Sequence, residues 1–364
     1  MPIRLWLLPV AAALSAAAGA AEPLFPITVR DKHGFISRVG TVVVPPEYDA
    51  ADYADGIVRV RRGTRTAYLD AQGKRLIAPQ EEMTEPFAEG LTPARGRSAE
   101  GKYLTGYKDT AGNWTITPRF GHGLNFSEGY AEVAMADEWG VSKFGYADRR
   151  GEITIAPRFD KTFPFSCGLA RVEVAKRLRV IDPKGRDVTP ADVDHVGVCS
   201  EGLIRIWKGR KQGYMNGSGA IVIEPQFDNA DKFKEGLARV WVSGKYGYVD
   251  RSGKLAIAPR FATAESFSDG LALVKEDEKI LFIDKRGKPV LEPDVQRAYP
   301  FSEGYAVVRS GGKYGYIDKR GNFAVEPRFS FARPFKNGLG YVVVGRGGGY
   351  IKPNGEFVWR SDES

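Results

Sequence analysis

Short runs of alternating apolar and polar residues, separated by glycine-containing turns, recur along almost the whole chain. In the seventh of these units the alternation predicts strands at 237–242, 245–250 and 254–258. Ser243-Gly244 makes the first turn, and residues 250–253, Asp-Arg-Ser-Gly, make the second. Pro259 is predicted to end the third strand, because proline cannot donate a ladder hydrogen bond. Each unit is therefore predicted to be a three-stranded antiparallel meander.

The units follow one another at a fixed period. The first residue of the second turn recurs in steps of 39, 39 and then 34 residues, at Asp70, Asp109, Asp148, Asp182, Asn216, Asp250, Asp284 and Asp318. A connector of about 10 residues follows each unit and carries two phenylalanines, as at Phe261 and Phe267. One meander cannot bury a full core, so neighbouring units are expected to share these aromatic side chains.

Ten such units, with nine connectors, run from Ile27 to Trp359. The first begins with a first strand and the last ends with a third strand, so no strand is left over to close a ring by exchange. Ten units also exceed the usual four to eight blades of a propeller. The sequence therefore favours an all-β protein of tandem three-stranded repeats in an open superhelix or solenoid. The alternative is a β-propeller-like ring.

Residues 1–20 are predicted to be a secretory signal peptide. Arg4 supplies the positive start, residues 5–18 are apolar but too few to span a bilayer, and residues 18–20 form a small-x-small cleavage site. Residues 21–364 are then a single repeat domain, exported to a periplasm or secreted. No later segment is apolar enough to cross a membrane.

The chain is mildly basic, with a formal net charge of +8, and its lysines and arginines are spread through every repeat. In an exported protein this balance indicates anionic polysaccharide or peptidoglycan as a partner, rather than nucleic acid. A solvated repeat surface would have the same composition.

Two stretches carry a resemblance to a known family. Residues 312–318 read Gly-Lys-Tyr-Gly-Tyr-Ile-Asp, and residues 301–308 read Phe-Ser-Glu-Gly-Tyr-Ala-Val-Val. Over about residues 27–359 the chain resembles the WG, or KWG, repeat family of bacterial proteins. Tyrosine or phenylalanine replaces the tryptophan that gives the family its name, as at Phe144, Tyr246 and Tyr314. The resemblance implies a non-catalytic repeat module and supplies no activity or ligand.

The two cysteines, Cys167 and Cys199, lie at related places in the connectors that follow the fourth and fifth units. Equivalent connectors of adjacent units should be neighbours, so an exported chain is expected to join them by a disulfide. Two separate buried thiols are one alternative. A metal site is another, because Asp192, Asp194 and His195 lie close to Cys199 in the sequence.

An aromatic and basic stripe is the main candidate binding surface. It comprises Trp207 and Trp241, which hold the same place in adjacent repeats, the arginines two residues before them, Arg205 and Arg239, and Lys275 and Arg309 at the tryptophan position of the next two repeats. Tryptophan beside arginine can stack on a sugar ring or contact an anionic polymer. The alternative is packing between units.

Two insertions lengthen the loop between the first and second strands of the third and fourth units, at about residues 96–102 and 135–143. Insertions at one place lie on one edge of an array and often bind partners. The second insertion contains Trp139, a further candidate for partner binding. An exposed loop without a function is the alternative.

A catalytic group is hard to assemble from this sequence. The three histidines, His33, His122 and His195, lie in different repeats, and no nucleophile elbow, phosphate loop or zinc-protease motif is present. We therefore expect a non-enzymatic, exported module, without a cofactor, that binds an envelope polymer or a protein. The alternatives are a hydrolase on a propeller-like ring, using His122, His195 or Glu138, and a purely structural scaffold. The oligomeric state is left open.

Overall fold

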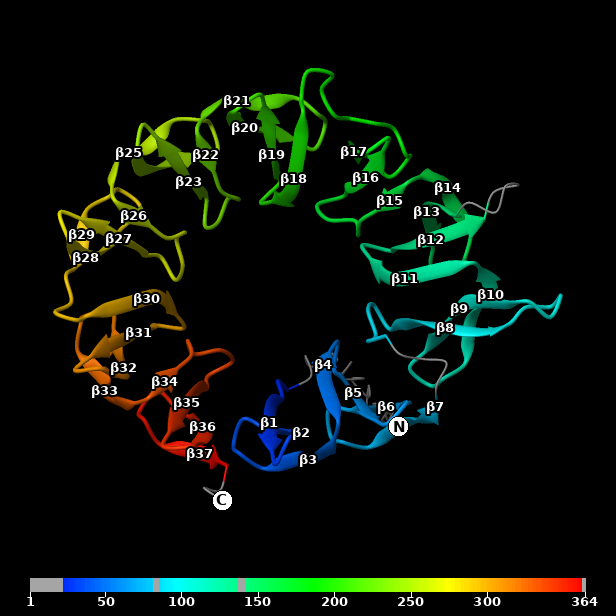
Figure 1. The fold of residues 1–364 in the computed structure, drawn as a ribbon, viewed down its shortest axis with the longest axis horizontal. Helices are drawn as coiled ribbons and strands as arrows, with labels where there is room; N and C mark the ends of the chain where they lie inside the picture. Colours follow the sequence, from blue (N-terminus) through cyan, green and yellow to red (C-terminus); the bar gives the residue numbers. More distant parts are fainter. Residues whose placement is uncertain (1–21, 81–84, 137–141, 362–364) are drawn as a thin grey trace, which may run out of the picture.

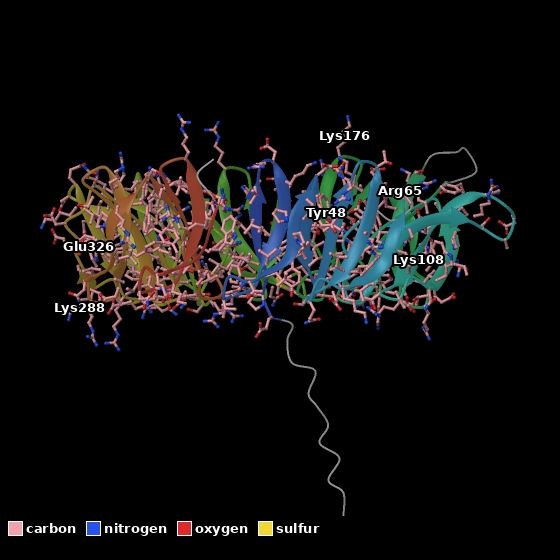
Figure 2. All side chains as sticks on the ribbon, turned by 90° about the horizontal axis from the view of Figure 1, so that it is seen from below. Tyr48, Arg65, Lys108, Lys176, Lys288 and Glu326 are labelled. Carbon is pink, nitrogen blue, oxygen red and sulfur yellow. A yellow bond between two sulfur atoms is a disulfide. The ribbon has the colours of Figure 1, made fainter. Side chains whose placement is uncertain are left out.

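The protein is a ring of small β-sheets. The computed structural model describes residues 22–80, 85–136 and 142–361. These residues form strands and turns and no helix, and their strands make ten antiparallel sheets, here called blades 1 to 10 in chain order. The blades follow one another around a ring (Figure 1). Seen from the side, the strands run between the two flat faces of the ring (Figure 2).

The bounds of the strands in the first five blades are as follows. Blade 1 contains β1 (Phe25–Val29), β2 (Lys32–Ile36) and β3 (Val42–Tyr48). Blade 2 contains β4 (Ala50–Ala54), β5 (Ile57–Arg62), β6 (Arg65–Asp70) and β7 (Arg75–Gln80). Blade 3 contains β8 (Leu91–Arg97), β9 (Tyr103–Asp109) and β10 (Trp114–Phe120). Blade 4 contains β11 (His122–Ser127), β12 (Tyr130–Ala136), β13 (Ser142–Asp148) and β14 (Ile153–Phe159). Blade 5 contains β15 (Lys161–Thr162), β16 (Ala170–Val174) and β17 (Arg177–Ile181).

The other five blades each have four strands. Blade 6 contains β18 (His195–Ser200), β19 (Leu203–Lys208), β20 (Lys211–Asn216) and β21 (Ile221–Phe227). Blade 7 contains β22 (Asn229–Ala230), β23 (Leu237–Val242), β24 (Lys245–Asp250) and β25 (Leu255–Phe261). Blade 8 contains β26 (Thr263–Ala264), β27 (Ala272–Glu276), β28 (Lys279–Ile283) and β29 (Pro289–Leu291). Blade 9 contains β30 (Arg297–Ser302), β31 (Tyr305–Ser310), β32 (Lys313–Asp318) and β33 (Phe323–Phe329). Blade 10 contains β34 (Phe331–Ala332), β35 (Gly340–Val344), β36 (Gly347–Ile351) and β37 (Phe357–Arg360).

Blade 7 shows how the sequence forms a blade. The strands β23 and β24 begin and end as predicted, but the connector adds a short innermost strand, β22, so the blade has four strands rather than three. The prediction that Pro259 ends the third strand is wrong, because β25 continues to Phe261. This strand forms one edge of its sheet, where a missing N–H group removes no ladder bond on the outer side.

Two recurrent residues explain the local geometry of the repeat. The side chain of Asp250 accepts hydrogen bonds from the N–H groups of Ser252 and Lys254, at 2.9 and 3.1 Å, as the turn prediction requires. Between the two tyrosines lies Gly247, where a Cβ atom would come within 2.6 Å of the Ile257 carbonyl oxygen. The glycine of the motif is therefore needed because the neighbouring strand crosses closely over it.

The hydrophobic core lies between blades. Tyr248 and Phe261 of blade 7 pack with Phe267 and neighbouring aliphatic residues of blade 8 in one buried cluster. The ring of Tyr248 lies 4.9 Å from that of Phe267, and its hydroxyl donates a hydrogen bond of 2.6 Å to the carbonyl of Glu265. Neighbouring units therefore share their connector aromatics, as the sequence predicts.

The contact between blades 10 and 1 closes the ring, so the expectation of an open superhelix is wrong and the ring, the alternative, is present. The Tyr350 hydroxyl of blade 10 donates a 2.8 Å hydrogen bond to the Pro26 carbonyl of blade 1. Its ring lies 5.5 Å from that of Phe25, within a buried cluster that joins the two blades. Closure needs no exchanged strand. Tyr350 joins blade 10 to blade 1 through its hydroxyl and its ring, as Tyr248 joins blade 7 to blade 8.

Candidate functional site

The recurrent acidic residues of the Phe-Ser-Glu-Gly turns join each blade to the next. The Glu201 carboxylate of blade 6 accepts the Gly236 N–H of blade 7, and the Glu235 carboxylate accepts the Gly270 N–H of blade 8, both at 3.0 Å. Lys285 of blade 8 adds an ion pair to Glu235 at 3.5 Å. The same amide contact is made by Asp55, Glu89, Glu128, Asp269 and Glu303. These carboxylates therefore hold the ring together.

One link in this series is covalent. Cys167 of blade 5 stands at the place of the acidic residue and forms a disulfide with Cys199 of blade 6, with Cα atoms 6.3 Å apart. Gly217 of blade 6 stands where Lys285 of blade 8 pairs with an acidic residue. The predicted disulfide is thus present, and it replaces a carboxylate link together with its cation.

The alternative metal site near Cys199 has other partners. Asp192 forms an ion pair of 2.5 Å with Lys208, and the Asp194 carboxylate accepts the Gly209 N–H at 2.6 Å. Across residues 22–80, 85–136 and 142–361, no three His, Cys, Asp or Glu side chains form a group that could hold a metal ion.

The arginines of the predicted stripe lie at seams between blades. The Arg205 guanidinium lies 4.5 Å from the centre of the Trp207 ring and donates to the Ala230 carbonyl of blade 7. In the next blade, Arg239 pairs with Asp231 and donates to the Ala264 carbonyl of blade 8. Both arginines therefore bridge neighbouring blades, and the alternative of packing between units describes their contacts.

The rest of the stripe is spread over three successive blades, 7 to 9. Trp241 packs on Tyr246 at 4.3 Å, Lys275 pairs with Glu278 at 2.5 Å, and Arg309 lies 5.9 Å from the Tyr314 ring centre. Each belongs to the second strand of its own sheet, so these side chains are not brought together in one site.

The candidates of the enzyme hypothesis come from separate blades. His122 begins β11 of blade 4, whereas His195 begins β18 of blade 6 and packs on Trp207 with ring centres 4.9 Å apart. Blade 5, with β15 to β17, lies between blades 4 and 6 (Figure 1). Trp139 and Glu138 lie outside the described residues.

A buried carboxylate in blade 4 was missed by sequence reasoning. Glu132 holds the place that Arg239 holds in blade 7, and only 3% of its surface is exposed. Burial raises the pKa of Glu132, and the neighbouring Thr162 hydroxyl of blade 5 reduces that effect. The available signal was a single acid at a place where four other repeats carry an arginine, Arg59, Arg171, Arg205 and Arg239. The residue faces a seam, where it is packed rather than accessible.

A groove of about 700 Å³ lies where the ring closes. Blade 1 has three strands, and among the described residues no strand pairs with the inner edge of β1. In the neighbouring blades this inner place is held by β34 and β4 (Figure 1). The groove is lined by Pro23, Leu24, Phe25, Pro26 and Phe35 of blade 1, by Ala51, Asp52 and Tyr53 of blade 2, by Ser302 of blade 9, and by Arg333, Pro334, Phe335, Lys336, Asn337, Leu339, Tyr341 and Tyr350 of blade 10.

Aromatic side chains form the walls of this groove. Tyr53 lies 6.3 Å from the Phe35 ring, and its hydroxyl donates a 3.0 Å hydrogen bond to the Glu22 carbonyl. On the other side, Tyr341 lies 5.3 Å from Tyr350, and burial raises the pKa of Tyr350 to about 12. The Tyr350 hydroxyl thus stays neutral at physiological pH and keeps the proton that it donates to the Pro26 carbonyl.

The rim of the groove is positively charged. Arg333 and Lys336 are exposed, and neither has a carboxylate partner within the described ranges. The one acidic side chain of the lining, Asp52, is held by Arg59 through a 2.8 Å hydrogen bond. An aromatic floor with unpaired cations suits an anionic guest that also has an apolar part. The sequence signal for this site was the first unit, which has no connector before it.

The chain belongs to the family of proteins with WG-containing repeats. Seven segments match, over residues 34–63, 106–139, 144–176, 213–246, 246–279, 282–314 and 314–346, and together they span more than half of the chain. This confirms the resemblance seen in the sequence. Comparison with curated protein sequences finds no match.

Several solved structures match this chain at low identity and with low TM-scores. Hsv2p of Kluyveromyces lactis is 12% identical over 62% of this chain and 90% of its own, with a TM-score of 0.33. The extracellular domain of the putative hybrid two component system BT3049 of B. thetaiotaomicron is 11% identical over 96% of this chain, with a TM-score of 0.29. PorZ of Porphyromonas gingivalis, a surface component of the type-IX secretion system, is 10% identical over 86%, with a TM-score of 0.28.

The chain spans about half the length of these two bacterial proteins, 57% and 52% respectively. Likeness at this level assigns no function. In the described part of the chain, no helix has the length and apolar character needed to cross a membrane.

Proposed function

We propose that this protein is an exported, non-catalytic interaction module that binds a protein partner at the groove where its ring closes. The observation that carries the proposal is an aromatic groove beside the inner edge of β1, with which no strand of the described residues pairs. Pockets of this kind, apolar with a few convergent polar groups, are the usual place for ligands. An exposed strand edge is a template for pairing with another chain.

Export is supported by two features. Residues 1–20 have the composition of a secretory signal peptide. The disulfide between Cys167 and Cys199 is of a kind that persists in oxidising compartments. The periplasm and the extracellular space both meet these conditions.

A binding role is favoured over catalysis by the way the ring uses its polar residues. The repeated acids accept backbone N–H groups of the next blade, and the stripe arginines bond its carbonyls. The groove itself offers tyrosines, an arginine and a lysine, with Asp52 already held by Arg59. This set can bind and orient an anionic group, but it contains no paired acid and base.

The experiment is capture in the envelope of the native host. A photo-crosslinking residue replaces Tyr53 in the groove, and a control protein carries it at Val290, which is exposed on blade 8. We expect one discrete protein adduct from position 53 and none from position 290. Pelleting with peptidoglycan, equal in both proteins and without a protein adduct, would contradict the proposal and favour an envelope polymer.

A further inference from the structure

The other blades show which segment occupies the inner edge that, in the described part of blade 1, has no strand beside it. In four of them the innermost segment begins with an aspartate whose carboxylate accepts the N–H that opens the next turn of the same blade. These bonds join Asp49 to Gly63, Asp160 to Ala175, Asp194 to Gly209 and Asp228 to Ser243, at 2.7, 2.8, 2.6 and 3.1 Å. An acid at this place is therefore a recurrent feature of the blades, although blade 8 has Ala262 there and blade 10 has Ser330.

The backbone of the innermost segment adds two further bonds. In blade 7, the N–H of Asp228 donates to the Trp241 carbonyl at 3.0 Å, and that of Asp231 donates to the Arg239 carbonyl at 2.9 Å. Blade 8 repeats both bonds at 2.8 Å, from Ala262 and Glu265. The segment is thus fixed by an acid and by two N–H groups three residues apart.

Blade 1 presents the matching groups without that segment. Aligned through the turn after β1, Arg30 holds the place of Ser243, Thr28 that of Trp241, and Pro26 that of Arg239. In blade 7 the carbonyls at the two latter places, those of Trp241 and Arg239, point to the inner edge and accept N–H groups of the innermost segment. The aligned carbonyls of Thr28 and Pro26 therefore face the inner edge of β1, where no described strand pairs with them. The Pro26 oxygen also accepts the Tyr350 hydroxyl, so a guest N–H would be its second donor.

Blade 1 differs from the other blades at one aromatic position, and this difference limits the length of segment that its inner edge can accept. In blade 8 a connector aromatic, Phe267, packs on the tyrosine of the preceding blade, and Ala272 follows at the start of β27. Blade 1 has Phe25 at the place of Ala272, and this ring already packs on Tyr350. The aromatic position is thus filled by the chain itself, and the vacant part is the short strand with its acid.

We propose that an extended acidic segment of a partner protein adds to blade 1 as its fourth, innermost strand. This deepens the proposed function and rests on it. The leading carboxylate of the guest accepts the Arg30 N–H, and its backbone N–H groups donate to Thr28 and Pro26. The exposed cations Arg333 and Lys336 attract the acidic guest, and an apolar side chain of the guest lies between Tyr53 and Tyr341.

The probe is a peptide copied from blade 7, residues 227–232, Phe-Asp-Asn-Ala-Asp-Lys, which ends before the connector aromatic and is labelled for fluorescence anisotropy. It is titrated into the chain comprising residues 21–364, beside a peptide in which Asp228 is replaced by asparagine. We expect saturable binding that weakens roughly tenfold with the asparagine peptide, because the charge-assisted bond to the backbone is lost.

Matched protein variants locate the binding. Lys336→Glu reverses a charge at the groove, whereas Lys234→Glu makes the same change at the same place of the repeat in blade 7. We expect Lys336→Glu to weaken binding about fivefold and Lys234→Glu to leave it unchanged. Hydrogen exchange should slow in residues 23–31 when the peptide is bound, since their edge becomes paired.

The outcomes separate the two proposals. A partner captured at position 53 without slower exchange in residues 23–31 would overturn strand addition and leave the interaction module standing. Binding of the peptide that ignores Lys336→Glu would also overturn it. If residues 23–31 are already protected in the free protein, the chain fills its own edge and the inference is wrong. Protection by anionic glycan fragments instead of the peptide would identify a polymer site and contradict both proposals.

Discussion

Removing the disulfide between Cys167 and Cys199 should destabilise the ring by a predictable amount. The bond closes a loop with a sequence separation of 32 residues. The chain-entropy relation for a loop of that length gives roughly 3–4 kcal/mol. The seam between blades 5 and 6 also lacks the carboxylate link, because Cys167 replaces the acid, and Gly217 replaces its cation. Nothing at this turn therefore substitutes for the lost covalent bond.

The assay is urea unfolding of the Cys167→Ala, Cys199→Ala variant, followed by tryptophan fluorescence and by circular dichroism. We expect the unfolding free energy to fall by about 3 kcal/mol, with an unchanged dependence on urea. Coincident transitions by the two probes are needed for this comparison. The wild type under reducing conditions should show the same loss.

A second variant, which replaces the disulfide by the non-covalent contacts found between other blades, provides the control. Cys167→Glu with Cys199→Phe gives blades 5 and 6 the residues that other connectors carry at these places. We expect this variant to recover about 1–2 kcal/mol relative to the double alanine, from the carboxylate link and the buried ring. A double alanine within 0.5 kcal/mol of the wild type, at the same urea dependence, would refute the reasoning.

Three further perturbations test separate parts of the ring. Glu132→Gln should raise stability at pH 7, because burial raises the pKa of the carboxyl and disfavours its charged form; the gain should vanish as pH falls below 4.5, the ordinary glutamate value. Burial opposes ionisation of Asp182 too, but hydrogen bonds from Arg186 and Lys184 outweigh it and lower its pKa. Asp182→Asn should therefore cost its full amount of stability above pH 3.8, and the cost should fade as pH drops below 3.8 through the lowered pKa, in urea titrations across pH. Tyr350→Phe removes the hydroxyl contact with Pro26 and should cost about 1 kcal/mol; no change in the urea midpoint would contradict closure by this contact.

The repeat itself was predictable because each of its features is local. The turn aspartates bond N–H groups two and four residues ahead, so the spacing alone identified them, as at Asp250. The disulfide could be predicted because Cys167 and Cys199 hold related places in successive units. Strand bounds in β23 and β24 followed from the alternation.

Ring closure could not be read from the strand count. The expectation of an open array assumed that a ring must exchange a strand, whereas this ring closes through Tyr350, Phe25 and Pro26. These contacts are more than 300 residues apart, and their register depends on the small rotation between blades, which no local pattern encodes. The groove was missed for the same reason, because it exists only where the two ends of the chain meet.

The carboxylate links were within reach of the sequence. Each acid of the Phe-Ser-Glu-Gly turn has an N–H partner about 35 residues ahead, as for Glu201 and Gly236. The residue 50 positions after the acid varies together with the acid. Lys285 stands at this distance from Glu235 and pairs with it, whereas Gly217 stands at this distance from Cys167. Comparing residues one unit apart, rather than within one unit, would have indicated this link between blades.

A distance measurement across the closing seam tests the account most directly, since the groove and the proposed guest strand both require a closed ring. Spin labels on Val39 of blade 1 and Lys336 of blade 10 span that seam, near the contact of Arg38 with Gly338. Labels on Arg286 and Lys234 hold the same places across the ordinary seam between blades 8 and 7. A closed ring predicts the same short, narrow distance for both pairs. A short distance for the second pair with a far longer one for the first, on the order of 90 Å for ten sheets stacked about 10 Å apart in a straight array, would contradict it.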